Sequence, residues 1–304
     1  MSAPRTLRTL LAEGVRSLEA ADLSYGHGTT NALDEAAWLL LHALGLPPHE
    51  INAHLDAPVD DARFERARKL LRERIRTRKP AAYLVNEAWL GPWRFYVDER
   101  VIVPRSFIAE FFQAASAPRG EARGEGAVFT LAPKLRPARV LDLCTGSGCL
   151  AILAALAFPE AHVDAVDLSH DALAVAHRNI GDYGLAGRVE LIHSDLFHSL
   201  EGRAYDLIVS NPPYVKAASM RTLPQEYRRE PGMALASGHD GLDHTHAILR
   251  EAARFLVPRG LLVVEIGHNR KALERACPRL PFRWPRTSAG PGFVFTLPRE
   301  SLGK

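Results

Sequence analysis

The sequence has few cysteines and no secretion signal. Only three of its 304 residues are cysteine, and Cys144, Cys149 and Cys277 lack the paired spacing of a metal-binding cluster. The N-terminus also lacks the apolar core of a signal peptide. We therefore expect no cysteine-built metal site and a location in the reducing cytoplasm.

Long apolar runs and a large excess of charge are missing as well. The longest apolar runs, such as Leu150 to Phe158, are much shorter than the roughly 20 residues that a membrane-spanning helix needs. The 38 basic and 35 acidic residues leave a net charge of +3 and a pI near 8.8. We expect no membrane partner, and direct binding to nucleic acid stays open because this balance does not indicate it.

Hydrophobic residues are abundant, at 47% of the chain, which is enough for the core of one large domain or two unequal ones. Residues 1–82 are predicted to form an N-terminal helical domain that helps to recognise a substrate. An apolar stripe from Ala37 to Leu44 predicts one of its helices, which Asp34 can cap and Gly45 can end.

A second helix is predicted from about Asp61 to Arg78, with an apolar side that includes Phe64 and Leu71. The other side is either a solvated face with partners such as Glu65, or a surface that faces RNA. Both interpretations stay open. This side carries a series of basic residues: Arg63, Arg66, Arg68, Lys69, Arg72, Arg74, Arg76 and Arg78.

Residues 83–115 are predicted to form a β-hairpin and a connecting helix between two domains. Aromatic and β-branched residues alternate around Gly91 and Pro92, which is typical of a hairpin. The stretch 116–126 is rich in glycine and charge and has almost nothing to bury. We expect residues 116–138 to be a flexible linker.

Residues 139–304 are predicted to form an α/β domain with a mainly parallel, Rossmann-like sheet. Short apolar runs alternate there with helical patterns, and the runs are apolar on both faces, as in a sheet covered by helices on each side. The predicted strands are "RVLDLCT", "HVDAVDLS", "VELIHSD", "YDLIVSN", "GLLVVEIG" and "GFVFTL".

A glycine turn follows the first of these strands. Gly146 and Gly148 stand between the strand and an alanine-rich helix, so the backbone can approach a ligand at the start of that helix. Together with Ala151 and with Asp167 about twenty residues later, they also satisfy the dinucleotide fingerprint. An NAD enzyme therefore stays a candidate beside an S-adenosylmethionine enzyme.

Two further acids favour S-adenosylmethionine. Asp142 lies within the strand before the turn, where its carboxylate can face a cationic cofactor or orient the loop, and would repel a pyrophosphate. Asp195 ends the third strand, where it could accept a hydrogen bond from an adenine amino group, with Leu196 and Phe197 beside the ring. The glycine turn, Asp167, Asp195 and the end of the fourth strand make four strand ends in register, which favours a common site.

The fourth strand ends in Asn211, Pro212, Pro213 and Tyr214. The Asn211 side-chain oxygen and the Pro212 carbonyl are adjacent acceptors that match the two hydrogens of a planar amino group. The prolines stiffen the turn, and Tyr214 offers a flat surface to stack on a substrate. We predict a clamp that directs the nitrogen of an amide or exocyclic amine at a methyl donor beside Asn211.

No metal site is predicted among the histidines. His239, His244 and His246 cluster in one loop, but their spacing is weak and no cysteine accompanies them.

The motifs "LDLCTGSGCLAI", "VDAVDLSHDALAVAHRN", "SDLF", "YDLIVSNPPYV" and "EPGMALASGHDGLDHTHAIL" resemble those of the protein-glutamine methyltransferases, over about residues 33–297. The resemblance implies a class I S-adenosylmethionine-dependent methyltransferase that methylates a glutamine side-chain amide and releases S-adenosylhomocysteine. It also implies that Asn211 to Tyr214 hold the substrate. The implied cofactor-binding residues are Asp142, Cys144, Thr145, Gly146, Ser147, Gly148, Asp167, Asp195, Leu196 and Asn211.

That family has two main bacterial branches. One acts on peptide-chain release factors, the other on ribosomal protein L-3 of the large subunit. Residues 83–110 resemble the second branch: Ser106 to Glu110 replace the "PETE"-like residues of the first branch, and Cys144 replaces its usual glycine. The implied partner is therefore ribosomal protein L-3, free or in an assembling subunit.

Other functions stay open from the residues alone. Release-factor methylation is the nearest alternative, and the same clamp would also serve methylation of adenine in DNA. No separate region for recognising a DNA target stands out. Two different classes are an NAD oxidoreductase, which would need a catalytic acid or base in place of the clamp, and a non-catalytic scaffold for ribosome assembly.

Overall fold

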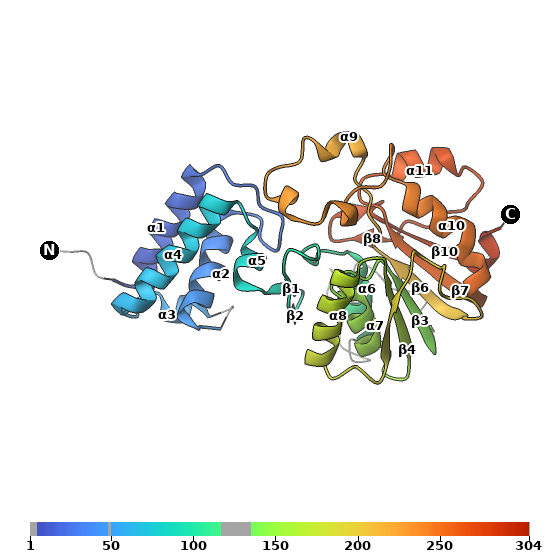
Figure 1. Cartoon of the computed structure of the whole chain (residues 1–304), viewed down its shortest axis with the longest axis horizontal. Coiled ribbons are helices and arrows are strands. Elements are labelled where there is room, and N and C mark those ends of the chain that lie inside the picture. Colours follow the sequence, from blue (N-terminus) through green and yellow to red (C-terminus); the bar gives the residue numbers. More distant parts are fainter. Residues whose placement is uncertain (1–4, 48–49, 117–134, 304) are drawn as a thin grey trace.

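A computed structural model describes residues 5–47, 50–116 and 135–303, with the side chains of 114–116 left out. Its N-terminal part is a bundle of helices in which α1, α2 and α4 pack on one another (Figure 1). Leucines such as Leu10, Leu40 and Leu71 fill the space between them. The helices are α1 (Leu7–Ala20), α2 (Ala32–Leu44), α3 (Ile51–His54), α4 (Asp61–Thr77) and α5 (Ala81–Val85).

Helix α2 begins two residues earlier than Asp34, the residue expected to cap it. The cap is Asn31, whose Oδ1 accepts a hydrogen bond from the Asp34 backbone N–H at 2.9 Å. The Asp34 carboxylate instead accepts from Asn31 Nδ2 at 2.7 Å, and Gly45 ends the helix at φ 67° as expected.

The basic side of α4 is not uniformly solvated. Arg74 was expected on that side, but it is fully buried and its Nε lies 2.7 Å from Glu35 of α2. Its Nη1 lies 3.5 Å from Glu226, a residue far along the chain that also binds Arg78 at 3.1 Å. Buried carboxylates on two other segments therefore decide which arginines of α4 turn inward.

The expected hairpin follows the bundle. Strands β1 (Ala88–Leu90) and β2 (Trp93–Phe95) pair antiparallel around Gly91. The connecting helix is α6 (Ile108–Ser116). Residues 117–134, most of the predicted linker 116–138, lie outside the described residues. The division into the four predicted domains stays a prediction.

A six-stranded sheet in the order β10-β7-β6-β3-β4-β5 forms the second half of the described chain. All neighbouring pairs are parallel except β10 with β7, so the mainly parallel sheet is confirmed. Its strands are β3 (Arg139–Leu143), β4 (His162–Asp167), β5 (Val189–His193), β6 (Tyr205–Ser210), β7 (Leu256–Glu265) and β10 (Val294–Pro298).

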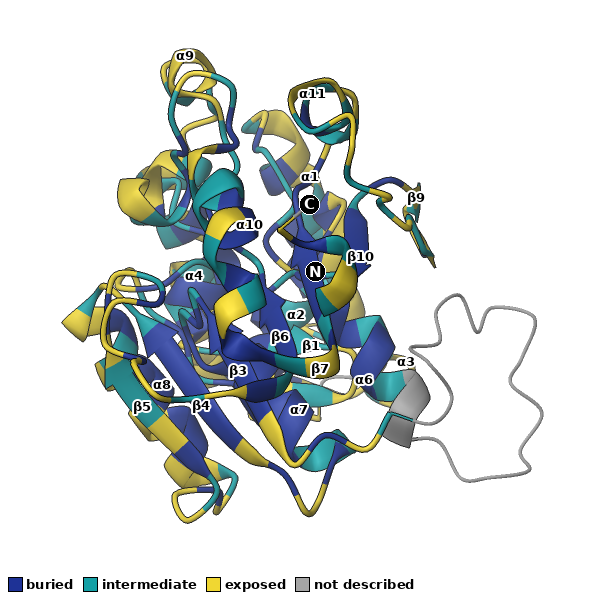
Figure 2. Cartoon of the chain, turned by 90° about the vertical axis from the view of Figure 1, so that its right-hand side faces the viewer, coloured by how far each residue is buried: buried dark blue, intermediate teal, exposed yellow. Residues whose placement is uncertain are grey.

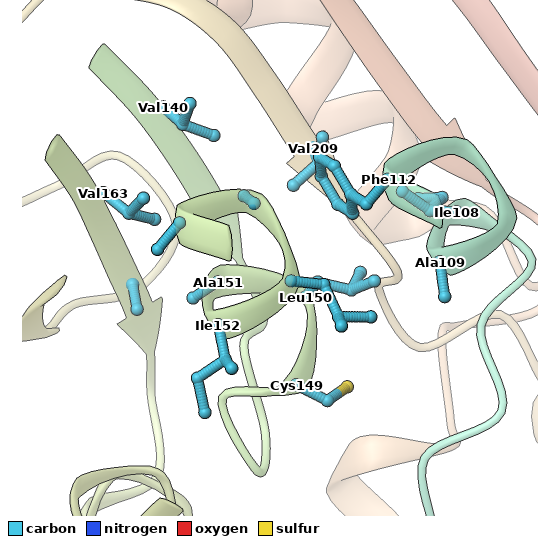
Figure 3. Packing of buried hydrophobic residues seen from close by; sticks show 14 of the residues in the cluster. Ile108, Ala109, Phe112, Val140, Cys149, Leu150, Ala151, Ile152, Val163 and Val209 are labelled. Carbon is cyan, nitrogen blue, oxygen red and sulfur yellow. The ribbon is translucent and has the colours of Figure 1, made fainter. Parts of the chain in front are cut away.

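Apolar side chains leave this sheet on both faces. Val140, Val163 and Val209 pack against α6 and α7 on one face, as Figure 3 shows. Leu141 and Ile208 pack against α10 on the other face. The central strands β3 and β6 are largely buried, whereas the edge strand β5 is partly exposed (Figure 2). The sheet is flanked by α7 (Cys149–Ala157), α8 (His170–Asp182), α10 (Asp243–Phe255) and α11 (Arg270–Ala276).

A long segment without a strand joins β6 to α10. It contains α9 (Ala217–Met220) and two single-turn 3-10 helices, Tyr227–Arg229 and Gly232–Ala234. The remaining elements are a small hairpin, β8 (Arg286–Thr287) with β9 (Gly290–Pro291), and a third 3-10 helix, Arg299–Ser301. Among the described residues, no helix combines the length and the apolar character needed to cross a bilayer.

Candidate functional site

The site lies where the strand order of the sheet reverses. Strands β3 and β6 are neighbours there, and the chain leaves β3 towards β4 on one side and β6 towards β7 on the other. Ligands of open α/β sheets bind at this point, at the carboxyl ends of the strands. The pocket found there is lined by Arg100, Val101, Ile102, Cys144, Gly146, Val166, Asp167, Leu168, Ser169, Ala172, Ser194, Asp195, Leu196, Asn211, Pro213, Met233, Ala234 and His244.

The glycine turn after β3 forms one wall. Gly146 lies at φ 55° and Gly148 at φ 79°, and a Cβ on Gly148 would stand only 3.1 Å from the Ala176 Cβ of α8. Cys144 also lies in the left-handed region, at φ 60°, although it is not a glycine. Such backbone strain is typical of ligand-binding turns, because the surrounding structure must hold it in place.

Asp142 supports this turn from below and does not line the pocket. It is fully buried, and its Oδ2 accepts hydrogen bonds from Thr145 Oγ1 at 2.6 Å and from the Ala151 backbone N–H at 3.0 Å. Thr145, Ser147 and Gly148 likewise shape the turn without lining the pocket. Asp142 was predicted either to face a cationic cofactor or to orient the loop, and these contacts agree with the second role.

Burial raises the pKa of Asp142 from 3.8 to about 7. The folded state therefore holds a proton that the unfolded state loses above about pH 4, so this group lowers stability as the pH rises from 4 to 7. In Asp142→Asn, the amide can keep both hydrogen bonds but does not ionise. We expect its stability relative to wild type to rise by up to about 1.4 kcal/mol per pH unit over this window, in urea unfolding at several pH values. A stability difference between variant and wild type that is the same at every pH would contradict this expectation.

Asp167 and Asp195 lie at the carboxyl ends of β4 and β5. Asp167 Oδ2 accepts from the Gly146 N–H at 2.8 Å and Oδ1 from the Ser169 N–H at 2.9 Å, so it joins two walls of the pocket. Burial raises its pKa. Asp195 is exposed and lies beside Leu196, which adopts φ 46°.

Phe197 does not lie beside the pocket, contrary to expectation. It is 2% exposed, and its ring stacks on Phe255 of α10 with centroids 4.6 Å apart. The side chain therefore belongs to the core on the other face of the sheet, and Leu196 is the apolar residue at this edge of the pocket.

Asn211 and Pro213 form the wall at the end of β6. Asn211 Oδ1 is buried, and no described residue donates a hydrogen bond to it. A buried acceptor without a partner costs about 1–3 kcal/mol, so proteins keep such an atom mainly where a ligand satisfies it. The structure thus brings Asn211 together with Cys144, Gly146, Asp167, Asp195 and Leu196 around one pocket.

Pro212 and Tyr214 do not line this pocket. The Tyr214 ring lies over Gly267, just after β7, so closely that a Cβ there would stand 2.7 Å from Tyr214 Cε2. The Tyr214 carbonyl accepts from Asn269 Nδ2 at 2.8 Å. Burial raises the pKa of the Tyr214 phenol, which is therefore a neutral group. Tyr214 thus borders the site from the side of β7.

Two buried glutamates behind Tyr214 were not predicted from the sequence. Glu265, at the end of β7, accepts from Ser106 Oγ at 2.7 Å and from the Phe107 N–H at 2.8 Å, at the start of α6. Burial raises its pKa to about 7. These bonds attach the segment before α6 to the strand beside the clamp.

Glu230 attaches the segment between β6 and α10 to other parts of the chain. It binds Arg105 through both oxygens, at 2.6 and 2.7 Å, and its Oε2 lies 3.6 Å from His27 Nε2 of the N-terminal bundle. Although burial raises its pKa, the interactions with His27 and Arg105 bring it down to about 2. Glu230 is therefore an anion that joins three distant parts of the chain.

Several lining residues were not predicted to belong to the site. Val101 and Ile102 come from the segment after the hairpin, and Met233 and Ala234 from the segment after the clamp. His244 lies in the first turn of α10, where its Nδ1 is 2.8 Å from Ser237 Oγ. All five residues lie in stretches that resemble the glutamine methyltransferases, residues 83–110 and 230–249, and this resemblance was the one signal that could have indicated them.

Comparison with known proteins agrees with this architecture. A model of the methyltransferase small domain matches residues 127–229, which include β3 to β6 and the clamp, and a model of the PrmC N-terminal domain matches residues 9–85. Together with the sheet topology, these matches confirm the predicted methyltransferase fold.

Curated relatives match almost the whole chain, and their names agree. The ribosomal protein uL3 glutamine methyltransferase of Neisseria meningitidis serogroup B is 52% identical over 98% of this chain and 94% of its own. Those of Bordetella pertussis and Bradyrhizobium diazoefficiens are 50% and 46% identical, over 98% of this chain and 96% and 92% of theirs. The chain belongs to the family of ribosomal protein uL3 glutamine methyltransferases.

Proposed function

We propose that this protein transfers a methyl group from S-adenosylmethionine to the side-chain amide nitrogen of a glutamine in ribosomal protein L-3 (uL3). The relatives that carry this name match over 98% of the chain. The observation that carries the chemistry is the buried Asn211 Oδ1 without a described partner, at the wall of a pocket formed by the glycine turn and two carboxylates. Since its proposed substrate is ribosomal, we assign the protein to the cytoplasm.

The pocket fits a cationic nucleoside cofactor. Asp167 and Asp195 supply negative charge, while Arg100 is neutralised by Asp98, 2.6 Å away. In this proposal Asp167 binds the ribose hydroxyls, Asp195 the adenine amino group, and Leu196 the face of the ring. Cys144 to Gly148, supported by Asp142, hold the amino-acid end. S-adenosylmethionine supplies a methyl group on a positively charged sulfur.

The clamp then prepares the amide nitrogen. Asn211 Oδ1 and the Pro212 carbonyl accept the two amide hydrogens, Pro213 stiffens the turn, and Tyr214 stacks on the planar amide. The nitrogen lone pair is thereby aligned with the methyl carbon. As the new N–C bond forms, the S–C bond breaks, and a proton leaves the nitrogen afterwards. No side-chain base is needed, which agrees with a neutral Tyr214.

The alternative functions can be distinguished by the substrate that becomes methylated. A mixture of the purified protein, methyl-labelled S-adenosylmethionine, uL3, a release factor and DNA should give label on uL3 alone, at a glutamine identified by mass spectrometry of the peptides. A uL3 variant with that glutamine replaced by asparagine is the matched control and should stay unlabelled. Label on the release factor or DNA alone would refute the substrate assignment, and no label anywhere would favour a scaffold.

A further inference from the structure

Two surface segments beside the clamp carry exposed cations that form no ion pair with any described residue. One runs from residue 216 to 229, between β6 and α10, and we name it the first basic segment. The other runs from residue 271 to 286, through α11 to β8, and is the second basic segment. Their exposed, unpaired cations are Lys216, Arg221, Arg228 and Arg229, and Lys271, Arg275, Arg279, Arg283 and Arg286.

Both segments begin at the walls of the substrate clamp. The first starts two residues after Tyr214, and the second starts just after Asn269, whose Nδ2 binds the Tyr214 carbonyl at 2.8 Å. Helices α9 and α11, one in each segment, lie at the same end of the catalytic half in both views (Figures 1 and 2). The residues that begin both basic segments are therefore close to the clamp.

Acidic residues do not offset these cations. Within the two segments the acids are Glu226, which is 1% exposed and paired with the buried Arg74 and the partly exposed Arg78, and Glu274, which pairs with Arg270. Asp240 and Asp243 lie between the segments, at the start of α10. The two segments together carry nine cations and two acids, so both are strongly positive in a chain whose net charge is only +3.

The exposed side of α4 also carries cations, and some of them are paired within the chain. There Arg68 binds Glu13 at 2.5 Å, Arg72 lies 3.7 Å from Glu65, and Arg63 lies 3.5 Å from Asp60. Arg66, Lys69 and Arg76 on that side are exposed and form no ion pair with a described residue, so its charges are compensated only in part. What distinguishes the two basic segments is their position: they follow directly on Tyr214 and Asn269, whereas the unpaired cations of α4 lie on the N-terminal bundle.

We propose that the two basic segments bind RNA phosphates, so that the protein acts on uL3 while uL3 is bound to ribosomal RNA. This inference rests on the proposed function. Proteins that bind RNA are generally basic, so a free ribosomal protein would be repelled by cations at the entrance of the site. RNA that surrounds the target glutamine would supply the missing negative charge.

The form of the surface favours RNA over an acidic peptide. A peptide carboxylate is typically held by a few buried arginines with bidentate geometry. Here the cations are exposed, lie on flexible side chains and extend along two chain segments, which suits a backbone that repeats its charge at regular intervals. Contacts of this kind position a substrate and do not read its sequence.

The test compares uL3 alone with uL3 bound to a large-subunit rRNA transcript, both with the full-length protein. The variant is Lys271→Gln/Arg275→Gln/Arg279→Gln. Against the complex, kcat/KM of this variant should fall at least about tenfold. The plot of log binding constant for the transcript against log salt concentration should become shallower, its slope changing by about 2. Against free uL3, its kcat/KM should stay within about twofold of wild type.

Two matched variants complete the design. The charge-conserving set Lys271→Arg/Arg275→Lys/Arg279→Lys should retain activity on the complex, and Arg66→Gln/Lys69→Gln/Arg72→Gln on α4 should behave like wild type. An unchanged rate of the first variant on the complex, or an equal loss in the α4 variant, would overturn the RNA inference while leaving the proposed function intact. Failure of wild type to methylate either form of uL3 would instead refute the proposed function.

Discussion

Replacing Asn211 with alanine should lower kcat for glutamine methylation by about 10²–10³-fold, the usual effect of removing one preorganised polar group from a reacting centre. The reason is that Oδ1 is already buried and free of described partners, so it is positioned before the substrate arrives. The measurement is transfer of label from S-adenosylmethionine to uL3, with cofactor affinity followed by calorimetry. That affinity should change by less than about tenfold, because Gly146 and Asp167 are untouched.

A matched control is Asn52→Ala on the exposed surface of α3, which should leave both kcat and cofactor affinity unchanged. If Asn211→Ala keeps wild-type kcat, the clamp is not the catalytic feature. If it abolishes cofactor binding while remaining folded, Asn211 serves the cofactor instead of the amide.

Replacing Arg74 with methionine should destabilise the protein by about 3–5 kcal/mol, because removal of one partner leaves a buried charge uncompensated. Glu35 and Glu226 are 1% exposed, and both face this guanidinium at 2.7 and 3.5 Å. Because Glu226 belongs to the segment after the clamp, the loss should also loosen the attachment of the N-terminal bundle. Urea unfolding measures the stability, and hydrogen exchange of α2 and α4 locates the change.

Arg72→Met is the control on the same helix. Its side chain is 64% exposed, so the change should cost less than about 0.5 kcal/mol. The loss in Arg74→Met should become smaller at acidic pH, since burial already raises the pKa of Glu35 and a protonated Glu35 needs no partner. Equal effects of the two substitutions would show that the buried ion pairs contribute nothing measurable.

The sheet and its ligand turns could be predicted because each depends on local sequence. Runs such as that from Leu207 to Val209 are apolar on both faces, and only a strand covered on each side can bury them. Gly146 and Gly148 both adopt positive φ, which a glycine accepts without strain. The hairpin around Gly91 follows from the same local rules.

Other features depended on partners far along the chain. The position of Arg74 gives no sign that Glu226 meets it, 152 residues later in the numbering, nor does Phe197 show that Phe255 covers it. Met233, Ala234 and His244 reach the pocket only because the segment after the clamp folds back over it. A pattern of one helix or strand contains no information about such contacts.

Residue order alone was enough to indicate the parallel sheet, the glycine turn, the acids at the strand ends and the Asn-Pro-Pro-Tyr clamp, because backbone geometry and side-chain chemistry act over a few positions. The folded chain decided which of these groups meet at one pocket, that Asp142 supports the turn from beneath, and that Tyr214 borders the site from the side of β7. Burial and long-range ion pairing cause these outcomes, and both depend on segments that come together only in three dimensions.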